Sequence, residues 1–107
     1  MSKNFVKVAH TSELLPGQKK PVQLGSEQIL VVNVAGSYYA VGDICPHSYA
    51  LLSKGQIYGD EVVCPLHGST FDIRTGEVIS KPALEGLTVY QIRVEGNEIL
   101  VAPQAKT

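Results

Sequence analysis

Two short motifs, each pairing a cysteine with a histidine, constrain this chain more than any other feature. The first reads Cys45-Pro46-His47, and sixteen residues later the second reads Cys64-Pro65-Leu66-His67. Thiolate and imidazole are donors that suit iron, zinc or copper. Four such ligands serve one metal centre only if the fold places the two motifs side by side.

The residues between the motifs favour such an arrangement. Gln56–Tyr58 and Glu61–Val63 read as two short strands, with a turn at Gly59-Asp60. A hairpin brings its two ends together. We therefore expect the loop that follows Asp43 and the loop that begins at Cys64 to be neighbours.

The rest of the chain reads as further strands rich in Val, Ile and Tyr, separated by turns, with hardly any helical periodicity. The expected strands are Phe5–Ala9, Lys19–Leu24, Gln28–Val34, Tyr38–Val41, Thr70–Ile73, Glu77–Ser80, Leu87–Val94 and Glu98–Ala102. The turn residues include Ala35-Gly36-Ser37 and Glu95-Gly96-Asn97. Short, closely spaced strands indicate an all-β sandwich or barrel, and 107 residues fit one domain.

The same cysteines and histidines could also serve a disulfide or a structural zinc ion. Cys45 and Cys64 could form a disulfide, although two cysteines without an export signal more often indicate metal or redox chemistry. A structural zinc site could use the same four residues, but the usual zinc spacings of two cysteines followed by two histidines are missing. The third histidine, His10, has no ligand-like neighbours and is assigned no role.

Composition narrows the function further. The net charge is −1, so no basic excess is available to bind nucleic acid. The first residues lack the apolar core of a signal peptide, and the longest apolar stretch, Ile29 to Ala35, is too short to span a bilayer. These features predict a soluble, cytoplasmic protein without membrane contact.

With these residues in view, the chain resembles the Rieske proteins, in which two histidines replace two cysteines on one iron of a [2Fe–2S] cluster. The resemblance extends over nearly the whole chain and includes His67-Gly68-Ser69-Thr70-Phe71-Asp72. It implies one cluster, with Cys45 and Cys64 on the inner iron and His47 and His67 on the outer iron. It also implies an antiparallel β-sandwich base with a smaller inserted cluster-binding subdomain, at about residues 43–80 of a single 1–107 domain.

Within that family, the chain looks like the stand-alone ferredoxins of bacterial aromatic-ring dioxygenase systems. Ala50 and Leu66 stand where high-potential members carry a further disulfide, and Phe71 replaces a tyrosine. Ser69 is kept where a serine in those members donates a hydrogen bond to a bridging sulfide. The resemblance therefore implies a low-potential protein with Ser69 in the second shell of the cluster. One departure is Pro46 and Ser48 around His47, where dioxygenase ferredoxins commonly have Thr and Gly.

The implied function is electron transfer, not catalysis. A flavin-dependent, NAD(P)H-oxidising ferredoxin reductase would supply single electrons, and a terminal Rieske non-haem iron oxygenase would receive them from a monomeric carrier. Two alternatives remain open at this point. One is the small Rieske-like subunit of a nitrite reductase, and the other is a zinc-stabilised interaction module.

Overall fold

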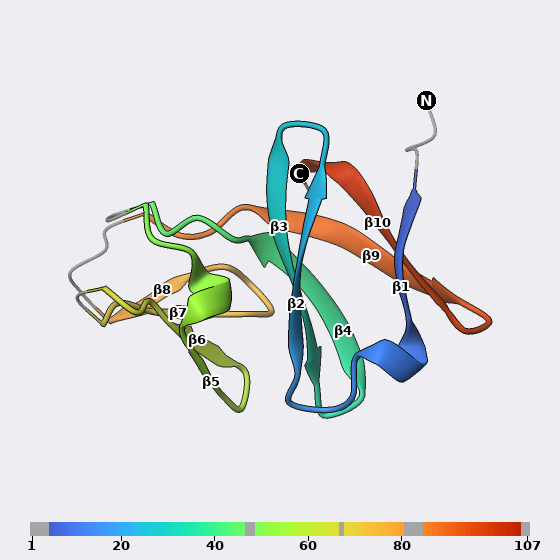
Figure 1. Cartoon of the computed structure of the whole chain (residues 1–107). Helices are drawn as coiled ribbons and strands as arrows, with labels where there is room; N and C mark the ends of the chain where they lie inside the picture. The colour runs from blue at the N-terminus through green and yellow to red at the C-terminus, as the bar shows by residue number, and fades with distance from the viewer. Residues whose placement is uncertain (1–4, 47–48, 67, 81–84, 106–107) are drawn as a thin grey trace.

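The computed structural model describes residues 5–46, 49–66, 68–80 and 85–105. They form two antiparallel sheets (Figure 1). The larger sheet has the strand order β1-β10-β9-β4-β3-β2, and the smaller has the order β5-β6-β7-β8. The strands of the larger sheet are β1 (Val6–His10), β2 (Lys19–Leu24), β3 (Glu27–Val34), β4 (Ser37–Gly42), β9 (Val89–Glu95) and β10 (Glu98–Ala105). Those of the smaller sheet are β5 (Gln56–Tyr58), β6 (Glu61–Val63), β7 (Thr70–Asp72) and β8 (Val78–Ser80).

Strand β3 is buried on both of its faces. All five side chains from Ile29 to Asn33 are inaccessible or nearly so. Successive residues of a strand point to opposite faces, so a strand covered on both sides reads as a continuous apolar run. The apolar stretch in the sequence is therefore a strand covered on both faces.

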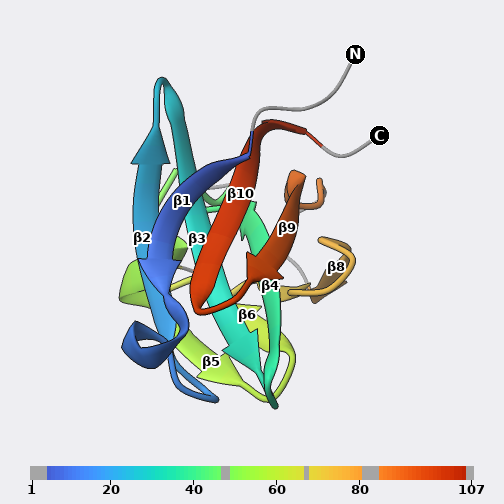
Figure 2. The same ribbon diagram turned by 90° about the vertical axis from the view of Figure 1, so that its right-hand side faces the viewer.

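The two faces of β3 belong to two different cores. Leu30 and Val32 pack in one buried cluster with Leu52, Val62 and Phe71, which come from η2 and the smaller sheet. This first core joins the two sheets, which lie beside one another in Figures 1 and 2.

The second core lies on the other face of β3, within the larger sheet. Ile29 and Val31 pack there with Ala9, Leu14, Ala40, Tyr90, Ile99 and Val101. Each core draws alternate residues of the same strand, as the two-residue period of a strand requires.

The turn between β3 and β4 has the geometry that its sequence predicts. Ala35 and Gly36 both have positive φ, at 52° and 96°. Two successive residues with positive φ suit the twist of a two-residue hairpin. The amide of Gly36 donates to Oδ1 of Asn33 at 2.8 Å, which holds the turn closed from the buried end of β3.

The expected all-β fold is confirmed, and most strand bounds agree within two residues. Strand β10 is longer than expected, because it continues past a register shift until Ala105 pairs with Tyr90. Two single-turn 3-10 helices, η1 (Thr11–Glu13) and η2 (Leu52–Lys54), were not predicted. Neither has the periodicity of a longer helix, so only tertiary contacts reveal them. No helix in the described ranges is long and apolar enough to cross a membrane.

Candidate metal centre

The first cysteine lies at the tip of a narrow two-stranded ladder. The amide of Leu52 donates to the carbonyl of Asp43 at 2.7 Å, Ile44 and Leu51 form an isolated bridge, and the amide of Cys45 donates to the carbonyl of Ala50 at 2.9 Å. These contacts hold the chain before and after the first Cys/His motif in a fixed antiparallel register. Cys45 itself is fully buried.

The second cysteine lies at the tip of the β6–β7 pair. Val63 pairs with Thr70, and the next residue, Cys64, donates its amide to the carbonyl of Ser69 at 2.8 Å. Gly68 has a φ of 76°, a conformation that most side chains disfavour. The two loops thus close in the same way, since each cysteine amide bonds the carbonyl five residues further along.

The two cysteines belong to the same buried cluster. Cys45 and Cys64 lie in the first core together with Leu52, Val62 and Phe71. The fold therefore brings together two residues that are far apart in sequence, as the hairpin between the motifs predicted. They are not joined in a disulfide. Two buried thiols on paired loops with apolar surroundings are a suitable donor set for an iron–sulfur group.

A close approach at Gly55 connects the two loops. A Cβ atom at this position would collide with the carbonyl oxygen of Val63 and lie 3.2 Å from Cδ of Pro65. Gly55 follows η2, at the end of the first ladder, whereas Val63 and Pro65 flank Cys64. Gly55 was not predicted from the sequence, because its φ of −92° is ordinary and only the neighbouring backbone requires glycine.

A buried carboxylate fastens the base of the first ladder. Oδ1 of Asp43 accepts the amide of Ser53 at 2.7 Å, and Oδ2 accepts the Ser53 hydroxyl at 2.9 Å. Asp43 is only 3% exposed. From the sequence Asp43 was expected only to mark a loop boundary, although a charged residue two positions before a cysteine ligand was a signal available there.

The remaining predicted site residues divide into two groups. Ser69 is described and fully buried next to the second loop. His47 and His67 lie outside the described residues, and the ranges that are described contain no group of three or more His, Cys, Asp or Glu side chains arranged for a metal. The four-residue ligand set therefore stays a prediction.

Three large apolar side chains are exposed on the described parts of the two loops. Tyr49 is 77% exposed, Leu66 is 48% exposed and Ile44, next to Cys45, is 40% exposed. Tyr49 also has a φ of 62°, which is uncommon for a residue with a bulky side chain. By contrast, Leu52 is buried beneath the loops.

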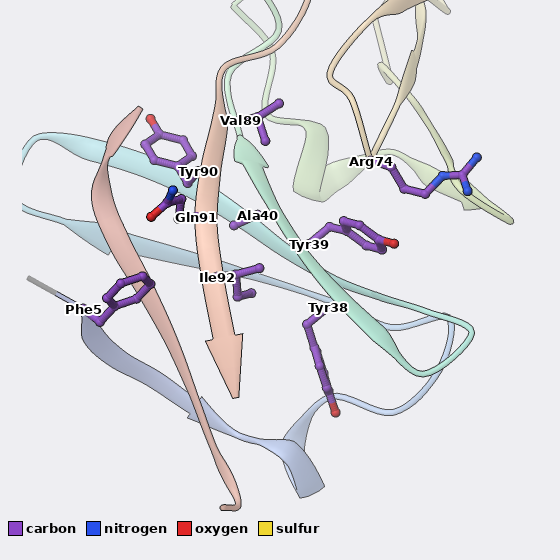
Figure 3. Close-up of a pocket in the computed structure, with 9 residues that line it drawn as sticks. All are labelled: Phe5, Tyr38, Tyr39, Ala40, Arg74, Val89, Tyr90, Gln91 and Ile92. Carbon is purple, nitrogen blue, oxygen red and sulfur yellow. The ribbon is translucent and has the colours of Figure 1, made fainter. Parts of the chain in front are cut away.

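A separate groove of about 410 Å³ lies on the larger sheet, over β4 and β9 (Figure 3). Tyr38, Tyr39 and Tyr90 line it, with Phe5 at one end and Arg74 at the other. The guanidinium of Arg74 is engaged by Asp60 at 2.7 Å. The groove does not include either cysteine, so the candidate metal centre is a feature of the loops.

The fold and site define a small antiparallel β-protein that presents a pair of buried cysteines on two matched loops. The chain belongs to the Rieske [2Fe-2S] domain family, whose match covers residues 4–91. A protein of this family carries a Rieske-type [2Fe–2S] cluster.

Individual relatives are similar along nearly their full length. The chain is 39% identical over 98 residues to the biphenyl dioxygenase ferredoxin subunit of Pseudomonas sp. (strain KKS102), covering 91% of this chain and 90% of that one. It is 35% identical to ferredoxin CarAc of Metapseudomonas resinovorans, covering 99% of this chain and 100% of that one.

A solved structure extends the likeness to three dimensions. The complex of reduced oxygenase and oxidized ferredoxin in carbazole 1,9a-dioxygenase contains a chain that superposes with a TM-score of 0.93 at 34% identity. The superposition covers 99% of both chains.

Proposed function

We propose that this chain is a soluble, cytoplasmic, low-potential Rieske ferredoxin. It would shuttle single electrons from a flavin-dependent NAD(P)H-oxidising reductase to a terminal Rieske non-haem iron oxygenase that hydroxylates aromatic rings. The unit of function is the single domain 1–107, with its cluster-binding part at about residues 43–80. The chain acts as a monomeric carrier and not as an enzyme.

One observation carries the proposal. Cys45 and Cys64 are buried in one core, on two loops that each close through a hydrogen bond from the cysteine amide. Two loops that each carry one cysteine and one histidine match the ligand set of a Rieske [2Fe–2S] centre, in which two histidines replace two cysteines on one iron. His47 and His67 follow the cysteines at spacings of two and three residues, so they complete the ligand set from the same two loops.

When bound, the cluster supplies a one-electron couple at near-constant geometry. The described residues contribute an environment without water and a fixed backbone for the ligands. The first core excludes water from the two thiols, and the Cys45–Ala50 and Cys64–Ser69 hydrogen bonds fix the backbone on which the ligands stand. A rigid site lowers the reorganisation that accompanies each electron transfer.

Two features support the low-potential branch. Ala50 and Leu66 cannot form the additional disulfide of the high-potential members, and Phe71 has no hydroxyl to donate toward a ligand sulfur. Hydrogen bonds to sulfur raise the potential of such clusters, so fewer donors favour a lower value. We place the midpoint potential toward the lower end of the roughly −150 to +300 mV Rieske range.

The relatives support the choice of partners. One relative is named as the ferredoxin subunit of biphenyl dioxygenase and another as a ferredoxin, and the similar solved structure is a complex of oxygenase and ferredoxin in carbazole 1,9a-dioxygenase. A carrier of this kind makes weak, transient encounters through a small surface. The exposed Tyr49 and Leu66 lie next to the ligand motifs, where such encounters would be most effective.

The first test is electron paramagnetic resonance of the purified, dithionite-reduced protein, together with iron and zinc analysis. We expect two irons per chain and a rhombic signal whose average g-value is below that of an all-cysteine [2Fe–2S] centre. Cys45→Ser and His67→Asn should abolish or alter this signal, whereas His10→Asn, at the exposed end of β1, should leave it unchanged. A colourless protein containing zinc would instead establish the structural-zinc alternative.

The partner assignment needs its own experiment. The oxidised protein is mixed anaerobically with NADH and the flavoprotein reductase of an aromatic-ring dioxygenase system, and then with the terminal oxygenase. We expect loss and recovery of the visible absorption in that order. A protein that holds the cluster but exchanges electrons only with a nitrite reductase would favour the nitrite reductase subunit alternative.

A further inference from the structure

Asp43 is the only charged side chain that is buried among the described residues, and it lies two positions before Cys45. We propose that its carboxylate is a positioning and potential-setting residue, which acts as a fixed negative charge beside the cysteine loops and lowers the midpoint potential of the centre. This inference rests on the proposed function and names one residue that sets its midpoint potential.

The carboxylate is held in one orientation. Both of its oxygens accept hydrogen bonds from Ser53, one from the amide at 2.7 Å and one from the hydroxyl at 2.9 Å. Two contacts directed at its two oxygens fix the plane of the carboxyl group. The side chain therefore has a fixed place at the base of the first ladder.

The same ladder holds this charge close to the ligand. The Asp43 amide donates to the carbonyl of Gln28 at 2.9 Å, which anchors the residue to β3. The Leu52–Asp43 and Cys45–Ala50 hydrogen bonds then fix the chain from Asp43 to Cys45 within the first ladder. Two consecutive peptide units span no more than about 7.6 Å between the Cα atoms of Asp43 and Cys45.

Within the described part of the chain, no lysine or arginine forms an ion pair with Asp43. Asp43 and Ser53 also line a second groove, which lies beside β2, and Lys54 borders it. The Lys54 side chain is exposed, so its charge is largely screened by water. Among the residues that the structure describes, no paired cation therefore cancels the field of the buried carboxylate. It opposes the addition of an electron to any group bound at Cys45.

The size of this effect follows from Coulomb's law. A unit charge about 10 Å away, in surroundings with an effective dielectric constant of about 20, changes the equilibrium constant for one-electron reduction roughly tenfold. A tenfold change corresponds to 59 mV for a one-electron couple. Asp43 thus contributes to the low potential together with the missing disulfide and the missing tyrosine hydroxyl.

The test compares midpoint potentials of holoproteins by anaerobic redox titration at pH 7. Asp43→Asn removes the charge but keeps the shape and a hydrogen-bonding side chain, and we expect reduction to become about tenfold more favourable. Ser53→Ala keeps the charge and loses one hydrogen bond, and its midpoint should move much less. Glu95→Gln makes the same net charge change at the β9–β10 turn, at the opposite end of the molecule from the cysteine loops (Figure 1), and should not shift the midpoint.

A second variant guards against loss of the fold. Asp43→Ser is a second neutral variant, whose short side chain keeps a hydroxyl beside Ser53, so it too should raise the midpoint. Unchanged midpoints in Asp43→Asn, or in Asp43→Ser if the first variant does not hold a cluster, would overturn the inference. So would a shift in Ser53→Ala as large as that in Asp43→Asn, because loop geometry would then be responsible. In both cases an intact paramagnetic signal in the unmodified protein would leave the proposed function standing.

Discussion

The hydroxyl of Tyr90 donates a 2.6 Å hydrogen bond to Oε1 of Glu27, although 63 residues separate them in sequence. Tyr90 comes from β9 and packs in the second core, whereas Glu27 begins β3, so the bond crosses the larger sheet over β4. The Tyr90 hydroxyl thus has the carboxylate of Glu27 as its acceptor, at the beginning of β3, the strand that contributes residues to both cores.

Replacing Tyr90 by Phe should remove this bond and keep the apolar packing. A hydrogen bond to a charged group contributes about 1.5–3 kcal/mol to stability, and loss of about 1.5 kcal/mol should lower the unfolding midpoint by roughly 6–12 °C. Thermal unfolding followed by circular dichroism, at one fixed heating rate, measures the change. Tyr58→Phe is the matched control, because that side chain is 63% exposed. Equal midpoints for the two variants would contradict the assigned role.

The same pair predicts a pH dependence. Burial, reinforced by the hydrogen bond to Glu27 and its charge, raises the pKa of Tyr90 above its ordinary value near 10. The folded state therefore holds this proton more tightly than the unfolded state does. The resulting stabilisation is fully present below pH about 10 and is lost as the pH rises through the raised pKa. In stability measurements from pH 8 to 11, the unmodified protein should lose more stability above pH 10 than Tyr90→Phe. Parallel curves would contradict this.

Ser69→Ala tests the predicted hydrogen bond from a buried hydroxyl to a cluster sulfide. Removing a donor that favours the reduced form should make the midpoint potential more negative, by an amount on the order of 59 mV if the reduction constant changes tenfold. Ser37→Ala, at the exposed start of β4, should have no effect. An unchanged or more positive midpoint in Ser69→Ala would show that the hydroxyl bonds only the protein.

Leu66→Gln tests the docking surface. Leu66 is 48% exposed next to the second motif, and interface residues of this kind contribute on the order of 1 kcal/mol, or several-fold in rate or affinity. Electron transfer with the reductase and the oxygenase should slow, while the midpoint potential stays the same. Leu15→Gln is a suitable control, because Leu15 is 54% exposed and lies between η1 and β2. If the rates of electron transfer with both partners are unchanged in Leu66→Gln, docking uses another surface.

Gly55→Ala should separate the two cysteine loops, because the added methyl group collides with the backbone of Val63. We expect a lower iron content per chain and a lower unfolding midpoint, measured by metal analysis and circular dichroism. At Gly42 the nearest atom to an added Cβ is 3.8 Å away, in Thr88, so Gly42→Ala should retain its iron. A fully loaded Gly55→Ala protein would mean that the loops do not depend on this close approach.

Local patterns of residues were sufficient to predict the chemical class and most of the strands. Ligand chemistry is local, so Cys45-Pro46-His47 and Cys64-Pro65-Leu66-His67 identify the family without coordinates. Strand pattern and turn residues are local too, which is why the hairpin between the motifs and the turn at Gly36 were predictable.

The contacts that hold the cysteine loops and join them to the rest of the protein could not be predicted in this way. The Asp43–Ser53 pair, the close approach of Gly55 to Val63 and the Tyr90–Glu27 bond each join residues that no local pattern relates. Their partners are selected by the register of the strands and by the packing of two cores against β3. Such contacts exist only after the chain has folded, because their energy depends on burial and on distance in space, neither of which is written in the order of the residues.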